Sequence, residues 1–361
     1  MKTNRQSVVL KNSRSRTFRS RNNLPKVLFF LALAVVAVIL WLVWPLINGT
    51  PGNTTESTTT AATAVSTKPS VTTDQTAASE TAATLSPAER QARLDDAAEQ
   101  AAALLAAKSG RFAVYYQNLL TGETWQHNAE APFVAASSIK LGINTYLYTK
   151  IADGDISPDE ILKYDSRAYP TGDYESGTGS IQSQPNGTTY SVRDTSGLSI
   201  RISDNCGTNM VIRRLGGIDT VNVYLNSISS VVDYRKSVSY TNYAGDANSG
   251  RHRTSATDLG LHAVNLYKFW LADKESYQPL IDDLSETEFD FGIQKGIPAG
   301  IKVSHKIGTN GLYSAENDVG IVFADEPFVL CVMTEMGSAG AAHQIQADIA
   351  EIFYNYISEL N

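Results

Sequence analysis

The stretch that decides the fold is residues 133–140, Phe-Val-Ala-Ala-Ser-Ser-Ile-Lys. It ends an apolar run with Ser137 and places Lys140 three residues later. The apolar spacing beyond it predicts a helix that continues through Leu147 toward Gly154. Because residues three apart lie on one face of a helix, the Lys140 amine stands one turn above the Ser137 hydroxyl and can reach it.

A serine and a lysine at this spacing can form a nucleophile and its base. A serine hydroxyl is a poor nucleophile at its ordinary pKa and needs an adjacent base. A lysine amine serves as that base only where burial and positive neighbours lower its pKa. The positive end of the helix favours negative charge developing at Ser137. The S-x-x-K pattern alone is a weak signal, and the alternative is a solvated lysine on an ordinary helix.

A second polar motif, Ser203-Asp204-Asn205, follows 66 residues after Ser137. It precedes a predicted helix over 206–215, which the glycine pair 216–217 ends. We predict that Ser203 relays a proton to a leaving nitrogen and that Asn205 offers its amide to substrate. Asp204 is predicted to be a structural pin. The simpler alternative, that this motif only caps the helix, is compatible with the catalytic interpretation.

The third motif, residues 305–309, reads His-Lys-Ile-Gly-Thr and ends a predicted strand over 301–307. Lys306 would supply a cation that faces the serine hydroxyls. Gly308 would let a substrate backbone approach closely. The backbone N–H of Thr309 would pair with that of Ser137 as an oxyanion hole. The alternative for the third motif alone is an edge strand with a solvated lysine.

The three motifs together resemble the S-x-x-K, S-D-N and K-T-G set of class A β-lactamases and penicillin-binding proteins. The resemblance covers residues 88–361 and includes the glycine-rich segment 177–180, the helix-opening segment 254–259 and the strand 317–322. It implies an α+β fold, a β-lactamase-like α/β sandwich with an antiparallel sheet flanked by helices and an inserted all-α lobe. It also implies a serine hydrolase that acts on β-lactams through an acyl-enzyme.

One departure from this family is Ile307, which stands where the family has a hydroxyl residue. A threonine or serine at this position would usually bond the substrate's carboxylate, and isoleucine lacks the group to do so. Thr309 could partly take over this role. We therefore expect weaker initial binding of β-lactams.

A second departure concerns deacylation. Class A enzymes carry a glutamate in a loop after S-D-N, and it activates the water that hydrolyses the acyl-enzyme. Here no glutamate occurs between Glu175 and Glu275. Asp233 and Asp246 are the acids near that loop; either could act as a base in principle, but both are more typical of solvated loop carboxylates. We therefore expect slow deacylation. The alternatives are a D,D-peptidase-like cell-wall enzyme and a non-turnover penicillin-binding, wall-binding or sensor protein.

Further strands and helices are predicted around these motifs. A hairpin is expected from 111–119 and 123–127, joined at Thr121-Gly122, and apolar strands from 320–324 and 328–334. A terminal helix over 341–360 would pack on this sheet. The length of the region is sufficient for one large core with a lobe.

The chain begins with a predicted membrane anchor. Residues 1–26 contain eight lysines and arginines and no acid, and the 21 residues 27–47 form an apolar run long enough to span a bilayer. The basic arm should stay in the cytoplasm, with the catalytic domain outside. The run exceeds the 7–15 apolar residues of a cleaved signal peptide, so an uncleaved, single-pass signal anchor in the cell membrane is favoured.

A linker and the catalytic domain should follow the anchor. Residues 48–86 are rich in Thr, Ala and Ser and lack the apolar residues needed to fold, which predicts a disordered linker. The catalytic domain is predicted over 87–361. Its first helix should begin at Ser86, which forms a capping box with Glu89.

The charge and the cysteine and histidine content limit which partners and ligands the protein can have. The net charge is −7, and without the +8 of the basic arm the remainder carries about −15, which argues against nucleic-acid binding. Cys206 and Cys331 are predicted to be buried free thiols rather than a disulfide. The histidines lack metal-binding spacing, so neither a metal nor a cofactor is predicted. The expected partners are a small β-lactam or a peptidoglycan peptide, and the membrane; the sequence does not indicate the oligomeric state.

Overall fold

The computed structural model describes residues 85–229, 231–234, 238–241, 243–245, 247–250 and 253–360. The predicted basic arm 1–26, the apolar run 27–47 and almost all of the linker 48–86 lie outside these residues. Within the described part of the chain, no helix is both long enough and apolar enough to cross a membrane.

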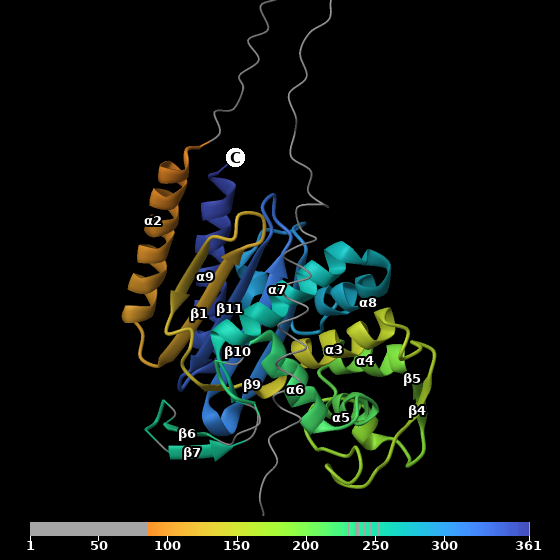
Figure 1. Ribbon diagram of the computed structural model, residues 1–361. Helices are drawn as coiled ribbons and strands as arrows, with labels where there is room; N and C mark the ends of the chain where they lie inside the picture. Colours follow the sequence, from red (N-terminus) through yellow and green to blue (C-terminus); the bar gives the residue numbers. More distant parts are fainter. Residues whose placement is uncertain are drawn as a thin grey trace, which may run out of the picture. The chain divides into compact units, whose positions relative to one another are not determined.

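A five-stranded antiparallel sheet forms the centre of the domain, in the order β2-β1-β11-β10-β9 (Figure 1). Its strands are β1 (Arg111–Asn118), β2 (Thr124–His127), β9 (Val303–Asn310), β10 (Ala315–Val322) and β11 (Phe328–Glu335). β1 pairs with β11 along its whole length, so an early and a late segment of the domain form the middle of one sheet. β9 is an edge strand, and it carries the third motif.

Helices cover both faces of this sheet (Figure 1). One face packs against α2 (Pro87–Ala106) and α9 (Ala339–Ser358), and the other packs against α7 (Ala256–Ala272). Successive side chains of a strand point to opposite faces, and β1 follows this rule. Its Tyr116 belongs to the core beneath α2 and α9, whereas Tyr115 belongs to the core shared with the helical lobe.

The helical lobe lies beside the sheet and carries the first two motifs (Figure 1). Its helices are α3 (Lys140–Ala152), α4 (Val192–Arg201), α5 (Asn205–Arg214), α6 (Ile218–Ile228) and α8 (Lys274–Ser285). The lobe also contains a small two-stranded antiparallel sheet of β4 (Ile161–Lys163) and β5 (Thr189–Ser191), which the prediction of an all-α lobe did not include. The α+β class with an inserted helical lobe is confirmed.

The predicted helix ends agree with the structure. The Ser86 hydroxyl accepts the Glu89 N–H at 3.3 Å and the Ser86 N–H donates to the Glu89 carboxylate at 2.9 Å, which completes the capping box. α5 ends at a glycine pair, Gly216 and Gly217, whose φ values are 96° and 95°. Only glycine adopts these angles without strain, so α5 stops where the sequence indicates.

The predicted start of the strand at residue 320 is wrong, because β10 begins at Ala315. The first half of β10 is polar, so a search for apolar runs does not find it. These polar residues are nevertheless buried, because their side chains form hydrogen bonds within the protein. Asn317 donates to the carbonyls of Val134 and Ala135 at 2.8 and 3.1 Å, and Asp318 bonds His305 at 2.9 Å.

The resemblance noted from the sequence places a glutamate-bearing loop in the segment between α6 and α7. Here it contains a hairpin of β6 (Val238–Thr241) and β7 (Ala247–Gly250). The next strand, β8 (Arg253–Thr254), pairs with β3 (Phe133–Val134) directly before the first motif.

Candidate active site

The nucleophile candidate lies in a tight turn. The short 3₁₀ helix η1 (Ala136–Ile139) leads directly into α3, so Ser137 lies at the beginning of this helical segment, as predicted. Ala136 has a φ of 47°, a left-handed angle that strains a non-glycine residue by about 1–3 kcal/mol. Ser138 is fully buried and its hydroxyl donates to the Ala135 carbonyl at 2.6 Å. Ser137 is therefore the serine of this pair that faces the pocket.

Strand β9 lies against this turn, and Gly308 makes the approach possible. A Cβ atom on Gly308 would lie 2.5 Å from the Ser138 nitrogen and 2.7 Å from the Ala135 oxygen. Gly308 therefore makes room for the nucleophile turn itself, and its predicted role in letting a substrate backbone approach stays a prediction. Thr309 follows it and lines the same pocket as Ser137. The oxyanion hole from the N–H groups of Ser137 and Thr309 stays a prediction.

Lys140 is buried and its amine faces the second motif. Its Nζ donates to the Ser203 carbonyl at 2.7 Å, to the Ser203 hydroxyl at 3.2 Å and to the Asn205 carboxamide oxygen at 2.8 Å. Burial lowers the pKa of Lys140 to about 7, although the nearby Asp204 and Glu175 carboxylates oppose this shift. An amine with such a pKa is partly neutral near pH 7 and can accept a proton.

The second motif is held in a strained and well-bonded turn. Ser203 is buried and has a φ of 55°, another left-handed non-glycine residue. The Asp204 carboxylate accepts the N–H of Gly207 at 2.9 Å and those of Ser180 and Ile181 at 2.7 and 2.9 Å. Asp204 is thus the structural pin that the sequence predicted, because it joins the start of α5 to the preceding loop.

Asn205 connects the lysine to the loop before the second motif. Its oxygen accepts the hydrogen bond from Lys140, and its Nδ2 donates to the Ser176 carbonyl at 3.2 Å. The prediction that this amide serves substrate therefore needs a qualification, since one donor is already directed to the protein. Asn205 still lines the pocket beside Ser137.

Lys306 is fully buried behind the pocket lining. Its Nζ donates to the Ile307 carbonyl at 3.2 Å and lies 5.6 Å from the centre of the Phe289 ring. Burial is the main cause that holds the pKa of Lys306 well below its ordinary value, and the charge of Lys140 adds to this effect. The predicted role of Lys306 as a cation that faces the serine hydroxyls stays a prediction.

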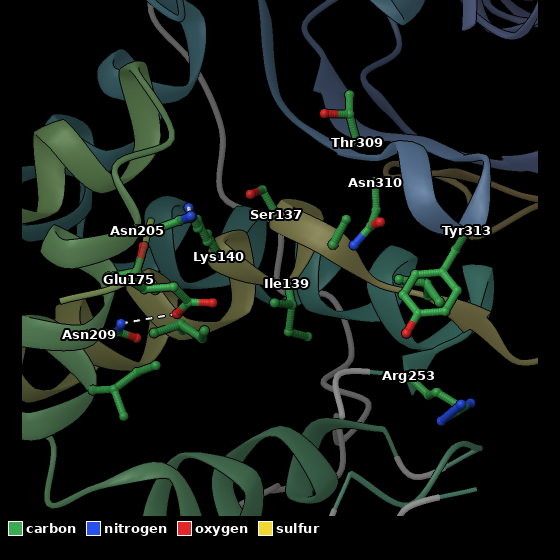
Figure 2. A pocket seen from close by; sticks show the side chains of 15 residues that line it. Ser137, Ile139, Lys140, Glu175, Asn205, Asn209, Arg253, Thr309, Asn310 and Tyr313 are labelled. Carbon is green, nitrogen blue, oxygen red and sulfur yellow. Dashed lines mark hydrogen bonds between the residues drawn. The ribbon is translucent and has the colours of Figure 1, made fainter. Parts of the chain in front are cut away.

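These elements enclose a cavity of about 460 Å³ (Figure 2). This volume is typical of sites for small ligands. The described lining residues are Val134, Ala136, Ser137, Ile139, Lys140, Ile143, Glu175, Asn205, Thr208, Asn209, Ile212, Arg253, Thr309, Asn310 and Tyr313. Four residues proposed from the sequence, Ser137, Lys140, Asn205 and Thr309, are among them, whereas Ser203, Lys306 and Gly308 lie behind this surface.

Several lining residues were missed by the sequence analysis. Glu175 lies in the loop before the second motif, and Asn209 lies one turn along α5 from Asn205. Arg253, Asn310 and Tyr313 line the side near the end of β9 (Figure 2). The position of Asn209 four residues after Asn205 could have indicated a shared helix face. Glu175 has no such signal, because the family's pattern places its glutamate after the second motif.

Neither of the two departures from the family's motifs contributes a described residue to the pocket lining. The Ile307 side chain is buried, with 5% of its surface exposed, and is not part of the described pocket lining. Asp233 is likewise outside that lining, and Asp246 lies outside the described residues. Both cysteines, Cys206 and Cys331, are free and buried, as predicted. Within the described residues, no three His, Cys, Asp or Glu side chains are grouped as a metal site.

Comparison with known proteins identifies the family. The pattern described as "Beta-lactamase enzyme family" matches residues 96–357, which is most of the chain and nearly all of its described part. The protein belongs to the beta-lactamase enzyme family.

Individual relatives are distant in sequence but similar over most of their length. The chain is 25% identical to beta-lactamase VEB-1 of Pseudomonas aeruginosa over 267 residues, which cover 70% of this chain and 87% of VEB-1. It is 24% identical to the carbapenem-hydrolyzing beta-lactamase KPC of Klebsiella oxytoca over 240 residues, 65% of this chain and 79% of KPC.

Solved structures show the same fold. PBP-A matches with a TM-score of 0.63 at 22% identity and covers 74% of this chain and 97% of its own. A point mutant of PBP-A, solved as an acyl-enzyme complex with penicillin-G, matches with a TM-score of 0.62 at 21% identity and covers the same shares. An ancestral class A beta-lactamase matches with a TM-score of 0.60 at 22% identity and covers 72% of this chain and 99% of its own.

Proposed function

We propose that the protein is a serine hydrolase that opens β-lactam rings through an acyl-enzyme on Ser137. The observation that carries this proposal is the buried amine of Lys140, whose pKa is lowered to about 7 within one turn of Ser137. A neutral amine can take the proton of the serine hydroxyl as the oxygen attacks the ring carbonyl. The cavity of about 460 Å³ is large enough for a bicyclic lactam.

The second half of acylation requires a proton for the leaving nitrogen. Lys140 becomes an ammonium when it takes the Ser137 proton, and it already bonds the Ser203 hydroxyl at 3.2 Å. The proton can pass through Ser203 to the lactam nitrogen as the C–N bond breaks. The family supports a β-lactam substrate, since VEB-1 and KPC are named beta-lactamases and a PBP-A mutant was solved with penicillin-G bound as an acyl-enzyme.

Deacylation is the slower step in this proposal. The segment 229–255 contains no glutamate, and of its described residues only Arg253 lines the pocket. The usual source of the deacylating base is therefore missing. A D,D-peptidase-like activity on peptidoglycan peptides uses the same acylation residues and is the alternative that slow hydrolysis would favour.

We also propose that the catalytic domain is held outside the cell membrane. The support is the sequence of the basic arm 1–26 and the apolar run 27–47. Such an anchor would keep the domain near the cell wall, where peptidoglycan peptides occur.

Covalent labelling tests the acyl-enzyme directly. Residues 85–361 are incubated with a fluorescent penicillin, and label is measured on a denaturing gel and by intact mass. Unmodified protein should take one label per chain, and Ser137→Ala should take none. Ser138→Ala is the matched control, because its hydroxyl bonds the Ala135 carbonyl rather than facing the pocket, and it should still be labelled. Label on the Ser137→Ala protein would show that another residue is the nucleophile.

A further inference from the structure

Glu175 contributes a carboxylate to the pocket from a segment that the family's motifs do not indicate. Among the described lining residues it is the one acidic side chain, and it comes from the loop before the second motif rather than from the segment after it. Figure 2 shows its carboxylate facing the space that Lys140, Ile139 and Asn209 also line. The side chain is only partly buried, so water can reach it.

The carboxylate is held in place by α5. Asn209, with 4% of its surface exposed, donates one Nδ2 hydrogen bond to Glu175 Oε2 at 3.1 Å and another to the Asp173 carbonyl at 3.2 Å. The Glu175 N–H points to the Cys206 sulfur at 3.5 Å, and the Cys206 thiol points back to the Glu175 carbonyl at 3.6 Å. Both the side chain and the backbone of Glu175 are thus bonded to the helix that carries Asn205.

The surrounding loop is tied to the same helix. Arg213 of α5 donates to both oxygens of the buried Asp173 carboxylate, at 2.8 and 2.9 Å. Asp173 also accepts the Asp165 N–H at 2.8 Å. The loop on which Glu175 lies is therefore fixed two residues before it, so the position of the carboxylate does not depend on Asn209 alone.

The charge of Glu175 also acts on Lys140, the proposed base of acylation. This charge is one of the causes that raise the pKa of Lys140 against the larger effect of burial. Ser137, Lys140 and Glu175 line one cavity, which has room for a water molecule beside a bound acyl group. A general base must lie within reach of the water that it activates, and Glu175 lines the same cavity in which an acyl group on Ser137 and its attacking water would lie.

We propose that Glu175 is the general base of deacylation, in place of the glutamate that the loop after the second motif lacks. The inference rests on the proposed acyl-enzyme on Ser137. Glu175 takes a proton from water while the water oxygen forms a bond to the ester carbonyl. The bond from that carbon to the Ser137 oxygen then breaks, and the proton returns to this oxygen. The products are a carboxylic acid and the free serine, and no other reactant is needed.

This assignment also defines what limits turnover. Asp233 lies outside the described pocket lining. One oxygen of the Glu175 carboxylate already accepts a hydrogen bond from the Asn209 amide, which leaves fewer acceptor positions for a water molecule. We therefore expect hydrolysis that is slow but measurable, and that depends on Glu175.

The test separates formation of the acyl-enzyme from its loss. Label uptake from a fluorescent penicillin and label release after removal of free drug are followed for the unmodified domain, Glu175→Gln and Glu130→Gln. Glu175→Gln keeps the shape and the Asn209 contact but removes the base. It should prolong the lifetime of the label by about 10²–10⁴-fold and change the uptake rate by less than about tenfold. Glu130 is exposed and lies outside the pocket lining, so Glu130→Gln should behave like the unmodified domain.

A variant of Asn209, which positions the carboxylate, provides a second test of the role of Glu175. Asn209→Ala removes one hydrogen bond from the carboxylate but keeps the carboxylate itself, so it should lengthen the label's lifetime less than Glu175→Gln does. In the double variant the Asn209 substitution should add nothing to the effect of Glu175→Gln.

The outcomes distinguish the two proposals. Uptake with an unchanged lifetime in Glu175→Gln overturns the role of Glu175 and leaves the acyl-enzyme proposal standing. A loss of uptake with unchanged release assigns Glu175 to substrate binding and also overturns its role as the base. No uptake by the unmodified domain overturns the proposed function, and with it this inference.

Discussion

Lys140 shows how a single buried residue sets the chemistry of the pocket. The residue has 5% of its surface exposed, and its amine has three protein acceptors, two on Ser203 and one on Asn205. Burial disfavours the ammonium, while the Asp204 and Glu175 carboxylates favour it, and burial is the larger effect. The resulting pKa of about 7 leaves a useful fraction of neutral amine at physiological pH.

Acylation should therefore depend on pH through Lys140. Below pH 7 the amine becomes protonated and cannot accept the Ser137 proton, so the acylation rate should fall about tenfold per pH unit and level off above about pH 8. Stopped-flow acylation with a chromogenic cephalosporin between pH 5.5 and 8.5 measures this profile. Circular dichroism at each pH confirms that the domain stays folded. An acylation rate that does not change with pH would exclude the neutral lysine as the base.

The same profile tests the electrostatic link to Glu175. The Glu175 charge raises the pKa of Lys140, so Glu175→Gln should move the midpoint of the acylation profile to lower pH. The control Glu130→Gln should leave the midpoint in place. A shift to higher pH would contradict the sign of this interaction.

At the level of elements, α5 and β9 build the site from two sides. The first turns of α5 supply Asn205 and Asn209, and Asp204 fixes the helix start to the loop before it. β9 lies against the nucleophile turn, and this turn leaves no room for a side chain at the position of Gly308. These contacts set the relative positions of Ser137 and Thr309, which lie far apart in the sequence but line one pocket.

Gly308→Ala should therefore impair acylation more than folding. The new methyl group would meet the Ser138 nitrogen at 2.5 Å, so β9 or the turn must move. Because misplacing reacting groups by about 1 Å can cost about 10²-fold in rate, we expect a loss of that order. Gly311→Ala is the matched control, since no atom lies within 4 Å of its added methyl group. Thermal unfolding shows whether both variants are folded at the assay temperature, and a Gly308→Ala protein with the parental acylation rate would refute the argument.

The elements that sequence patterns predicted well are those with local signals. The capping box at Ser86 and the glycine pair after α5 each satisfy a backbone requirement within a few residues, so their positions follow from the chain itself. The start of β10 could not be found in this way, because its polar residues are buried through bonds to distant partners such as Val134. Glu175 was missed for the same reason: its place in the pocket depends on contacts with α5.

At the scale of the whole domain, the motifs converge because the sheet joins distant parts of the chain. β1 and β11 are separated by about 200 residues and pair over eight positions, and the helical lobe is formed by the chain between them. The spacings of the three motifs suit one domain that brings them together, and in the structure Lys140 bonds Ser203 while Gly308 packs against the turn of Ser138. The sequence could not show which of the motif residues line the pocket, because Lys306 and Ser203 are withdrawn from its surface by packing in three dimensions.

The N-terminal sequence predicts where this domain acts. The basic arm and the 21-residue apolar run favour a cytoplasmic N-terminus and an external catalytic domain. Protease added to spheroplasts should therefore cut in the Thr-rich stretch 48–86 and release a folded fragment, because the described domain begins with the capped helix α2 at Pro87. The released fragment should still take fluorescent penicillin, and a cytoplasmic marker protein should remain intact as the control. If the full-length chain resists protease until the membrane is permeabilised, the catalytic domain faces the cytoplasm and the proposed topology is wrong.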